Sequence, residues 1–393
     1  MPTPSSHPLP YGRQHITDDD VAAVVATLRS DFLTQGPQVA EFEEKFAAYV
    51  RAKYAVAVSN GTAALHLCAL ALGVQPGQRV ITTPITFAAS ANCVRYCGGE
   101  VHFADIDPNT GLIDLQQVRR LLEAHPRGYF SGLIPVDFAG LAVDMEAFRT
   151  LADEFGLWII EDACHAPGGF FFAKQGEKRL CGSGQLAELA IFSFHPVKHI
   201  ATGEGGMVTT NDEVLYHRLR RLRSHGIERE GPGLLRQDEG GWYMEMQELG
   251  YNYRISDILC ALGISQLARA DEGLVRRRQL ATQYDAAFSA EPRVAVLAPG
   301  QPGHAYHLYV VQVENRRALY EFLRTKNILT QVHYVPVHRM PYYENLGWRA
   351  GDFPAAEAYY ARCLSLPLYP TLTDEEQAYV VASVREFLAQ NPA

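Results

Sequence analysis

The chain alternates between short apolar runs and longer segments whose apolar residues recur at helical spacing. Two amphipathic helices are expected first, one from Asp18 through Leu28 and one from Val39 through Tyr49. Strands and helices then alternate. We expect strands at 54–58, 79–83, 101–106, 132–138, 157–161, 189–194 and 207–210, and helices at 63–72, within 85–97, at 115–124 and at 145–155. This alternation predicts an α/β fold with βαβ units and a mostly parallel sheet.

The pattern changes after residue 224. Glycines, charges and aromatics mix without a period up to residue 253, which predicts a long irregular segment. A helix opens at Ser256, whose hydroxyl can cap it. Beyond it we expect strands at 306–313 and 329–334 and helices at 317–326, 355–363 and 374–388. We therefore expect a larger domain over residues 1–250 and a smaller α/β domain over residues 251–393.

Composition narrows the class of protein. The 393 residues are 47% hydrophobic and 20% charged, and the net charge of -9 argues against general binding to nucleic acid or to anionic membranes. The N-terminus shows no signal peptide, and no run approaches the ~20 apolar residues of a membrane helix. The seven cysteines form no Cys-x-x-Cys pair, so we expect free thiols, no metal site and a cytoplasmic protein.

One lysine lies in a constrained turn between two expected strands. Lys198 follows Pro196 and precedes a glycine cluster at 203–206. A lysine that must present its amine to a cofactor at one fixed point needs such a setting. The first hypothesis is a Schiff base between Lys198 and pyridoxal phosphate. The alternative is a β-turn whose lysine merely points to water, and this stretch alone leaves both open.

Two further features lie near expected carboxyl ends of strands. Asp162 ends a strongly apolar strand, where a carboxylate is costly unless a charged or hydrogen-bonding group meets it. A protonated pyridine nitrogen is such a group, and an ordinary N-cap is the alternative. The small residues of 59–62 precede a helix whose N-terminus favours an anion such as phosphate, although an ordinary β-to-α turn explains them too. Because ligands bind at this edge of parallel sheets, one site can hold all three features.

The chain resembles the sugar-nucleotide aminotransferases of the DegT/DnrJ/EryC1/StrS family. Five motifs carry the resemblance in the family's order: 60–67 (NGTAALHL), 86–89 (TFAA), 161–166 (EDACHA), 193–206 (SFHPVKHIATGEGG) and 250–254 (GYNYR). The resemblance implies a fold type I, aspartate aminotransferase-like α/β architecture. It also implies an enzyme that uses pyridoxal 5'-phosphate.

By position, the resemblance implies a role for each cofactor residue. Lys198 would be the Schiff-base lysine and proton shuttle, and Asp162 would pair with the ring nitrogen. Phe87 would stack on the ring, with a core aromatic as the alternative. His165 would lie near the phenolic oxygen, with a satisfied histidine at a strand end as the alternative. Ser193 would add a hydroxyl to the phosphate. The remaining phosphate contacts would come from Gly61, Thr62 and Ala63, through backbone amides and a hydroxyl.

The resemblance also implies partners. Asn252 would reach the phosphate of the neighbouring subunit's cofactor, which implies a homodimer with shared sites. L-glutamate would be the amino donor and a nucleotide sugar the acceptor. Candidate substrate contacts, each with a structural or surface role as the alternative, are His195, Arg254, His307, Tyr334 and His338, with Tyr306 and Arg229 behind them.

Variants of the motifs suggest a branch of the family. Residues 10–14 (PYGRQ), 195–198 (HPVK), 242–247 (WYMEMQ) and 333–338 (HYVPVH) are similar to the branch of pseudaminic acid biosynthesis. That branch aminates C4 of UDP-2-acetamido-2,6-dideoxy-β-L-arabino-hex-4-ulose. The alternatives are another keto nucleotide sugar linked to GDP, dTDP or UDP, a sugar dehydratase, or a non-catalytic regulator. The presence of Lys198 argues against the dehydratase, in which a histidine replaces the lysine. A Rossmann-like nucleotide-binding protein lacks its glycine fingerprint here.

Overall fold

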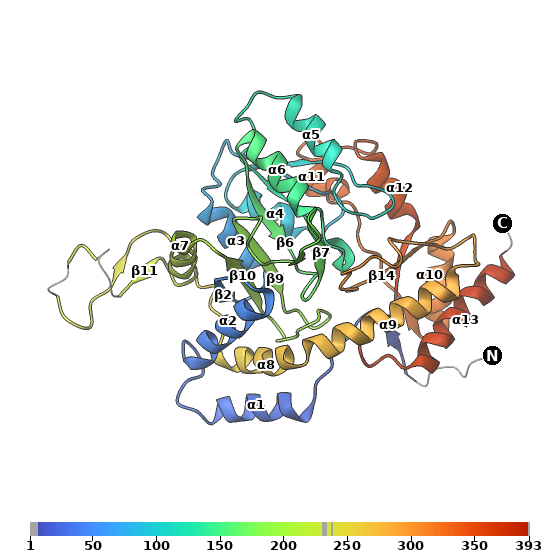
Figure 1. Ribbon diagram of the computed structural model, residues 1–393, viewed down its shortest axis with the longest axis horizontal. Helices are drawn as coiled ribbons and strands as arrows, with labels where there is room; N and C mark the ends of the chain where they lie inside the picture. The colour runs from blue at the N-terminus through green and yellow to red at the C-terminus, as the bar shows by residue number, and fades with distance from the viewer. Residues whose placement is uncertain (1–6, 230–233, 237–238, 392–393) are drawn as a thin grey trace.

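A seven-stranded sheet forms the centre of the computed structural model, which describes residues 7–229, 234–236 and 239–391. Its strand order is β2-β10-β9-β6-β5-β3-β4 (Figure 1). The strands are β2 (Tyr54–Val58), β3 (Arg79–Thr82), β4 (Glu100–Phe103), β5 (Gly132–Ile134), β6 (Trp158–Asp162), β9 (Leu189–Ser193) and β10 (Gly206–Thr210). Only β10 runs antiparallel to its neighbours, so the predicted mostly parallel sheet is confirmed.

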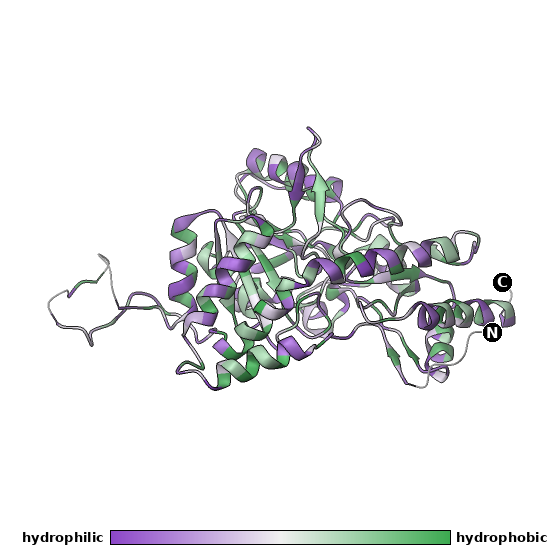
Figure 2. Cartoon of the chain, turned by 60° about the horizontal axis from the view of Figure 1, so that its bottom comes forward, coloured by the Kyte–Doolittle hydropathy of each residue, from purple (hydrophilic) through white to green (hydrophobic). Residues whose placement is uncertain are grey.

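Helices cover both faces of this sheet. Successive side chains of β2 point to opposite faces: Val56 and Val58 pack in one cluster with α3 and α4, and Ala55 and Ala57 pack in another with α2. Burial on both faces explains why the strands read as continuous apolar runs. The helices of this part are α1 (Asp18–Leu28), α2 (Pro37–Val50), α3 (Gly61–Ala71), α4 (Ala89–Tyr96), α5 (Leu115–Glu123), α6 (Met145–Phe155), α7 (Glu213–Arg223) and α8 (Asp257–Ala268). The helices are mixed purple and green in Figure 2, as amphipathic helices must be.

The second part of the chain surrounds a separate apolar cluster. Its antiparallel sheet joins β13 (Ala295–Val296), β14 (Tyr309–Gln312) and β16 (Cys363–Leu366). A two-residue strand, β15 (Ile328–Leu329), pairs with β1 (Leu9–Pro10), so the N-terminal segment joins this part. Its helices are α9 (Ala270–Phe288), α10 (Arg316–Thr325), α11 (Pro341–Glu344), α12 (Pro354–Arg362) and α13 (Asp374–Gln390).

The helix that opens at Ser256 belongs to the first part of the molecule. Ser256 caps α8 by accepting a hydrogen bond from the amide of Leu259. Cys260 of α8 is buried with Phe42 and Phe46 of α2. The next helix, α9, crosses to the second part, where it packs near α13 (Figure 1). We therefore propose that the division between domains lies after α8 rather than after residue 250.

Several expected boundaries are wrong. The strand expected through 138 stops at Ile134, because Pro135 follows and a 3-10 turn begins at Phe138. The strand expected at 329–334 is reduced to β15 and one bridge between Gln331 and Ser365. The helix expected through Cys363 ends at Arg362, where β16 begins. In the last two cases pairing with a distant strand, or its absence, overrides the local pattern.

Some elements were not predicted at all. They include α7, α9, the short elements β1, β13 and α11, and the hairpin of β7 (Phe170–Phe172) with β8 (Lys178–Leu180). Within the irregular segment, β11 (Ile227–Glu228) pairs with β12 (Glu245–Met246) in an arm that extends away from the body (Figure 1). Other parts of that segment lie outside the described residues. None of the helices in the described ranges is long and apolar enough to cross a membrane.

Candidate active site

The turn that carries Lys198 joins β9 to β10. The amide of Lys198 donates to the carbonyl of His195 at 2.8 Å, so the predicted β-turn is present. The glycines beyond it allow close backbone approach. A Cβ on Gly206 would lie 2.6 Å from the carbonyl carbon and oxygen of Asn60, where no side chain fits. The start of β10 is therefore held against the β2–α3 turn.

The amine of Lys198 meets a buried histidine. Its Nζ lies 3.3 Å from Nε2 of His307, 109 residues further along the chain. Burial lowers the pKa of Lys198, whereas the nearby Cys164 and Asp162 act in the opposite direction. The alternative of a lysine that only points to water is wrong. The lowered pKa makes this amine easier to deprotonate than an ordinary lysine, as a general base requires.

Backbone contacts bring His307 to this point from the second part of the chain. The amide of Ala305 donates to the carbonyl of Gly140 at 2.8 Å, and that of Leu308 donates to Ala139 at 3.2 Å. His199 Nε2 donates to the carbonyl of Ala305 at 2.8 Å. Gly140 has a φ of 100°, and a Cβ there would lie 2.8 Å from the amide nitrogen of Tyr306. Glycine is therefore required where the two segments meet.

His165 and Tyr334 continue the line of polar groups formed by Lys198 and His307; these four residues are called the row below. The amide of Ala139 donates to His165 Nδ1 at 3.2 Å, and His165 Nε2 lies 3.2 Å from the hydroxyl oxygen of Tyr334. Burial lowers the pKa of His165 well below its ordinary value, so the ring is neutral. Because Nδ1 accepts, the proton lies on Nε2, which donates to Tyr334. The hydroxyl of Tyr334 keeps its own proton for another acceptor.

Asp162 presents a buried carboxylate at the end of β6. Its side-chain oxygens accept from Ser90 Oγ at 2.7 Å and from the amide of Cys164 at 3.2 Å. The contact to Cys164 is the turn interaction expected of the N-cap alternative. Both partners are neutral donors, so within the described part of the chain the charge of Asp162 has no paired cation. A protonated ring nitrogen supplies that cation, and the carboxylate fits pyridoxal phosphate.

The β2–α3 turn offers amides for a phosphate, with one correction. As the first two residues of α3, Gly61 and Thr62 have amides without acceptors inside the helix. The amide of Ala63, predicted to bind the phosphate, instead donates to Asn60 Oδ1 at 2.8 Å. A Cβ on Gly61 would lie 3.1 Å from Cβ of Ser193, so Ser193 lies directly beside the turn. The helix start and this hydroxyl fit a phosphate.

Phe87 and Asn252 are both exposed at their predicted positions. Phe87 is 60% exposed, which excludes the core-aromatic alternative, and its ring centroid lies 6.3 Å from that of Tyr334. An exposed aromatic beside the row of polar groups leaves a ring face available to a bound ligand. Asn252 forms a backbone bridge to Ser224 at the base of the arm.

Of the residues predicted to bind the substrate, some lie at the site and others do not. His307 and Tyr334 lie in the row that begins at Lys198, and His195 is exposed on the lysine turn. His338 is a correction: it is fully buried and its Nε2 lies 2.9 Å from Glu357, so it faces the interior of its own segment. The contacts of the described residues do not connect Arg254 with Lys198, and that prediction stays untested.

Sequence reasoning missed several residues of the site. Ser90 supports Asp162, and Thr86 lies 2.8 Å from the Ser90 hydroxyl in turn. Thr86 was part of a recognised motif, but no local signal marked Ser90 as a partner of a residue 72 positions away. Ala139 could not be found either, because only its backbone takes part.

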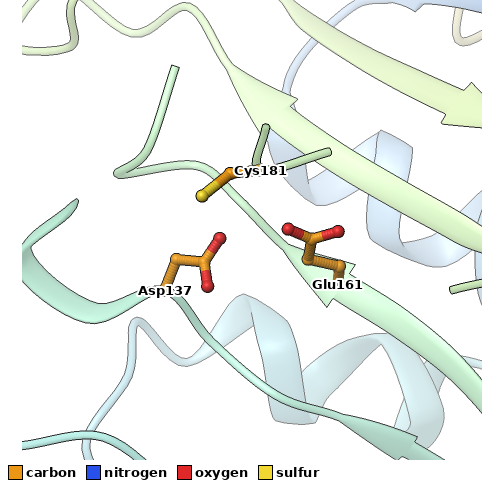
Figure 3. A group of neighbouring side chains, drawn as sticks. All are labelled: Asp137, Glu161 and Cys181. Carbon is orange, nitrogen blue, oxygen red and sulfur yellow. The ribbon is translucent and has the colours of Figure 1, made fainter. Parts of the chain in front are cut away.

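A buried pair of carboxyl groups lies next to Asp162. Asp137, Glu161 and Cys181 point toward one another, with their polar atoms within 4.8 Å (Figure 3). Burial raises the pKa of Asp137 to about 7 and that of Glu161 well above its ordinary value. Asp137 Oδ2 lacks a donor among the described residues. Because the pKa of Glu161 is raised, we propose that Glu161 holds a proton and shares it with this oxygen. The amide of Asp137 also donates to the carbonyl of Asp162 at 3.0 Å.

The fold and the site define a class of protein. A fold type I sheet with a lysine in the turn after β9, an unpaired carboxylate at the end of β6 and a helix start for a phosphate is the arrangement of a pyridoxal phosphate-dependent aminotransferase. The profile of the DegT/DnrJ/EryC1/StrS aminotransferase family matches residues 14–385. The chain belongs to this family of sugar aminotransferases.

Named relatives cover nearly the whole chain. The spore coat polysaccharide biosynthesis protein SpsC of Bacillus subtilis is 39% identical over 98% of both chains. The UDP-4-amino-4,6-dideoxy-N-acetyl-beta-L-altrosamine transaminase of Campylobacter jejuni is 36% identical over 95% of both. Among solved structures, Helicobacter pylori PseC, an aminotransferase of pseudaminic acid biosynthesis, superposes with a TM-score of 0.87. It is 30% identical and covers 98% of this chain and 100% of its own.

Proposed function

We propose that this aminotransferase moves the amino group of L-glutamate to C4 of UDP-2-acetamido-2,6-dideoxy-β-L-arabino-hex-4-ulose, a step of pseudaminic acid biosynthesis. The observation that carries the transfer chemistry is the half-buried Lys198, whose amine lies 3.3 Å from His307 and near enough to Asp162 for that carboxylate to act on its pKa. The Campylobacter relative and the Helicobacter structure support the sugar.

Each residue of the row has a proposed task. When bound, pyridoxal phosphate supplies an electron-withdrawing ring that stores the electrons released as a proton leaves the carbon beside the transferred nitrogen. Lys198 Nζ accepts that proton and later returns it, and burial, which lowers the pKa of Lys198, favours the neutral amine that can accept it. The Asp162 carboxylate holds a cation at the ring end of the site. The Tyr334 hydroxyl, oriented by His165, donates toward the phenolic end.

The lysine assignment is tested by absorption. We expect Lys198→Ala to lose the visible band of the lysine-bound cofactor and to lose activity by at least about a thousandfold, the scale of a missing acid–base group. Lys198→Arg is the matched control, since it keeps a cation but cannot form the link, and it should not restore either signal. A Lys198→Ala protein that keeps the lysine-bound band would refute the assignment.

A panel of keto sugars tests the substrate. The holoenzyme is incubated with L-glutamate and UDP-, GDP- and dTDP-linked 4-keto sugars, and the aminated carbon of each product is located by NMR. We expect amination at C4 of the UDP-linked N-acetyl sugar. Preference for a GDP or dTDP sugar, or amination at C3, would contradict the proposal while leaving the transfer chemistry intact. The similarity to SpsC makes this comparison necessary, because its name gives no sugar.

We also propose a homodimer in which Asn252 acts on the partner's site. The support is the extended arm, where Trp242 is 81% and Leu249 75% exposed, with Asn252 exposed at its base. Asn252→Leu and Lys198→Ala proteins, each inactive alone, are mixed after partial unfolding. A two-fold dimer with shared sites should regain about a quarter of normal activity, from one intact site in each mixed dimer. No recovery although mixed dimers form would place Asn252 at its own subunit's site.

A further inference from the structure

A small basic cavity reaches Lys198 from the side of α9. Its volume is about 200 Å³, and its wall includes Lys198, Arg13, Arg276 and Arg277. Glu272, which is exposed, is the only acidic residue among the described residues that line it. A cavity with this balance of charge selects an anion.

Arg277 is the unusual member of this wall. It is 1% exposed, yet its acceptors are three backbone carbonyls, those of Leu368 at 2.9 Å, Tyr306 at 3.2 Å and His307 at 3.4 Å, all through one nitrogen. Its Nε has no partner among the residues that the structure describes. Burial lowers the pKa of Arg277 to about 10, so it still carries its charge at neutral pH.

The other arginines of the cavity are mostly engaged. Arg276 turns to Asp374 and to the carbonyl of Leu372, at 2.8 and 2.7 Å, and Arg269 pairs with Asp20. Arg13 is exposed and lies within hydrogen-bonding reach of the Tyr369 hydroxyl, but it forms no ion pair with a carboxylate of the described chain. Two cations, one deep beside Lys198 and one outside, are thus left for a ligand.

We propose that Arg277 and Arg13 bind the carboxylate groups of the dicarboxylic amino donor and of the 2-oxo acid it becomes. This inference rests on the proposed function. Two unpaired guanidinium groups match two carboxylates, and the contact with Lys198 places the ligand at the transfer chemistry. A nucleotide sugar has the same negative charge, but about 200 Å³ lies below the several hundred Å³ that ligands of that size need.

Binding of succinate, an unreactive dicarboxylate, tests the subsite by calorimetry on the holoenzyme. We expect Arg277→Lys to weaken succinate about 10- to 100-fold, since lysine keeps the charge but not the paired donors. The half-saturating concentration of glutamate should rise similarly, and that of the keto sugar should stay within about twofold. Arg278→Lys, the neighbouring arginine of α9, is the matched control: it does not line the cavity, it donates instead to the carbonyl of His304, and its replacement should leave succinate affinity unchanged. Succinate binding equal to wild type, or an equal change for the sugar, overturns the inference.

A second variant covers the case in which Arg277→Lys does not fold, which thermal unfolding detects. Arg13→Gln removes an exposed cation and should weaken succinate about 2- to 5-fold. Unchanged affinity in Arg13→Gln then overturns the inference. Failure of the proposed function looks different, because the wild-type protein would then not consume glutamate at all.

Discussion

Nζ of Lys198 and Nε2 of His307 lie 3.3 Å apart, and this contact joins the two parts of the chain at the site. The lysine belongs to the central sheet, and the histidine belongs to a segment whose backbone is bound to Gly140 and Ala139. Movement between the domains therefore changes the environment of the amine. The contact makes His307 a positioning residue for the lysine.

Replacement of His307 by alanine should lower kcat about tenfold. This factor corresponds to the loss of one hydrogen bond to a group that is charged during part of the catalytic cycle. Water admitted to the space would reduce the burial that lowers the pKa of Lys198. That pKa should then rise, and the acid limb of the pH–rate profile should move to higher pH. His217→Ala, a histidine with a 60% exposed side chain on α7, should change neither quantity. An unshifted profile would mean that His307 does not set the state of the amine.

Asp162→Asn should lower kcat by about a hundredfold or more, because a neutral amide cannot hold a proton on the ring nitrogen. Ser90→Ala should have a smaller effect of about tenfold, since it removes one donor from the carboxylate and keeps the charge. Steady-state kinetics on cofactor-saturated proteins measure both. Equal losses in the two variants would argue that Asp162 acts through its hydrogen bonds rather than its charge.

The shared proton of Asp137 and Glu161 should make stability depend on pH. Burial raises the pKa of Asp137 to about 7, whereas an unfolded aspartate ionises near pH 4. Between roughly pH 4 and 7 the folded chain binds more protons than the unfolded chain, so this group makes stability fall as pH rises. The slope is at most about 1.4 kcal/mol per pH unit for one proton.

Asp137→Asn should therefore flatten the fall of stability with pH. Its carbonyl oxygen still accepts from the amide of Val143, as Oδ1 does at 3.0 Å, and its NH₂ can donate to Glu161. Urea unfolding at pH 5, 6 and 7 measures the slope. Asp153→Asn, whose side chain is 68% exposed on α6, serves as the control and should keep the wild-type slope. A slope as steep in Asp137→Asn as in the wild type would show that Asp137 does not contribute to it.

Phe87→Ala should weaken cofactor binding about 3- to 10-fold and leave the free energy of unfolding of the apoprotein within about 0.5 kcal/mol. The reason is that the ring is 60% exposed and has little burial to lose until a ligand covers it. Equilibrium titration with pyridoxal phosphate measures the affinity. Phe172→Ala, similarly exposed at 56% on β7, should keep wild-type affinity. A destabilised apoprotein with normal cofactor affinity would assign Phe87 a structural role.

Local pattern predicted the parts of this protein that depend on neighbours in sequence. The apolar runs predicted the strands of the central sheet, because burial on both faces demands continuous hydrophobic residues. The turn at Lys198 and the turn of small residues before α3 could be predicted, since glycine and small residues mark close backbone approach, although α3 begins at Gly61 rather than at residue 63. Asp162 could be found because a carboxylate at the end of an apolar strand is costly unless a charged or hydrogen-bonding group meets it.

Tertiary structure alone decided which distant groups meet these residues. His307 was a ranked candidate, but only the docking of 305–308 on Gly140 and Ala139 places it against Lys198. Ser90 reaches Asp162, and Glu161 shares a proton with Asp137, through the packing of different strands and helices. The burial and the pKa of each group depend on the folded interior, because all of its neighbours together remove it from water. The sequence by itself therefore determined where the chemistry lies, and the packed fold determined its protonation and its partners.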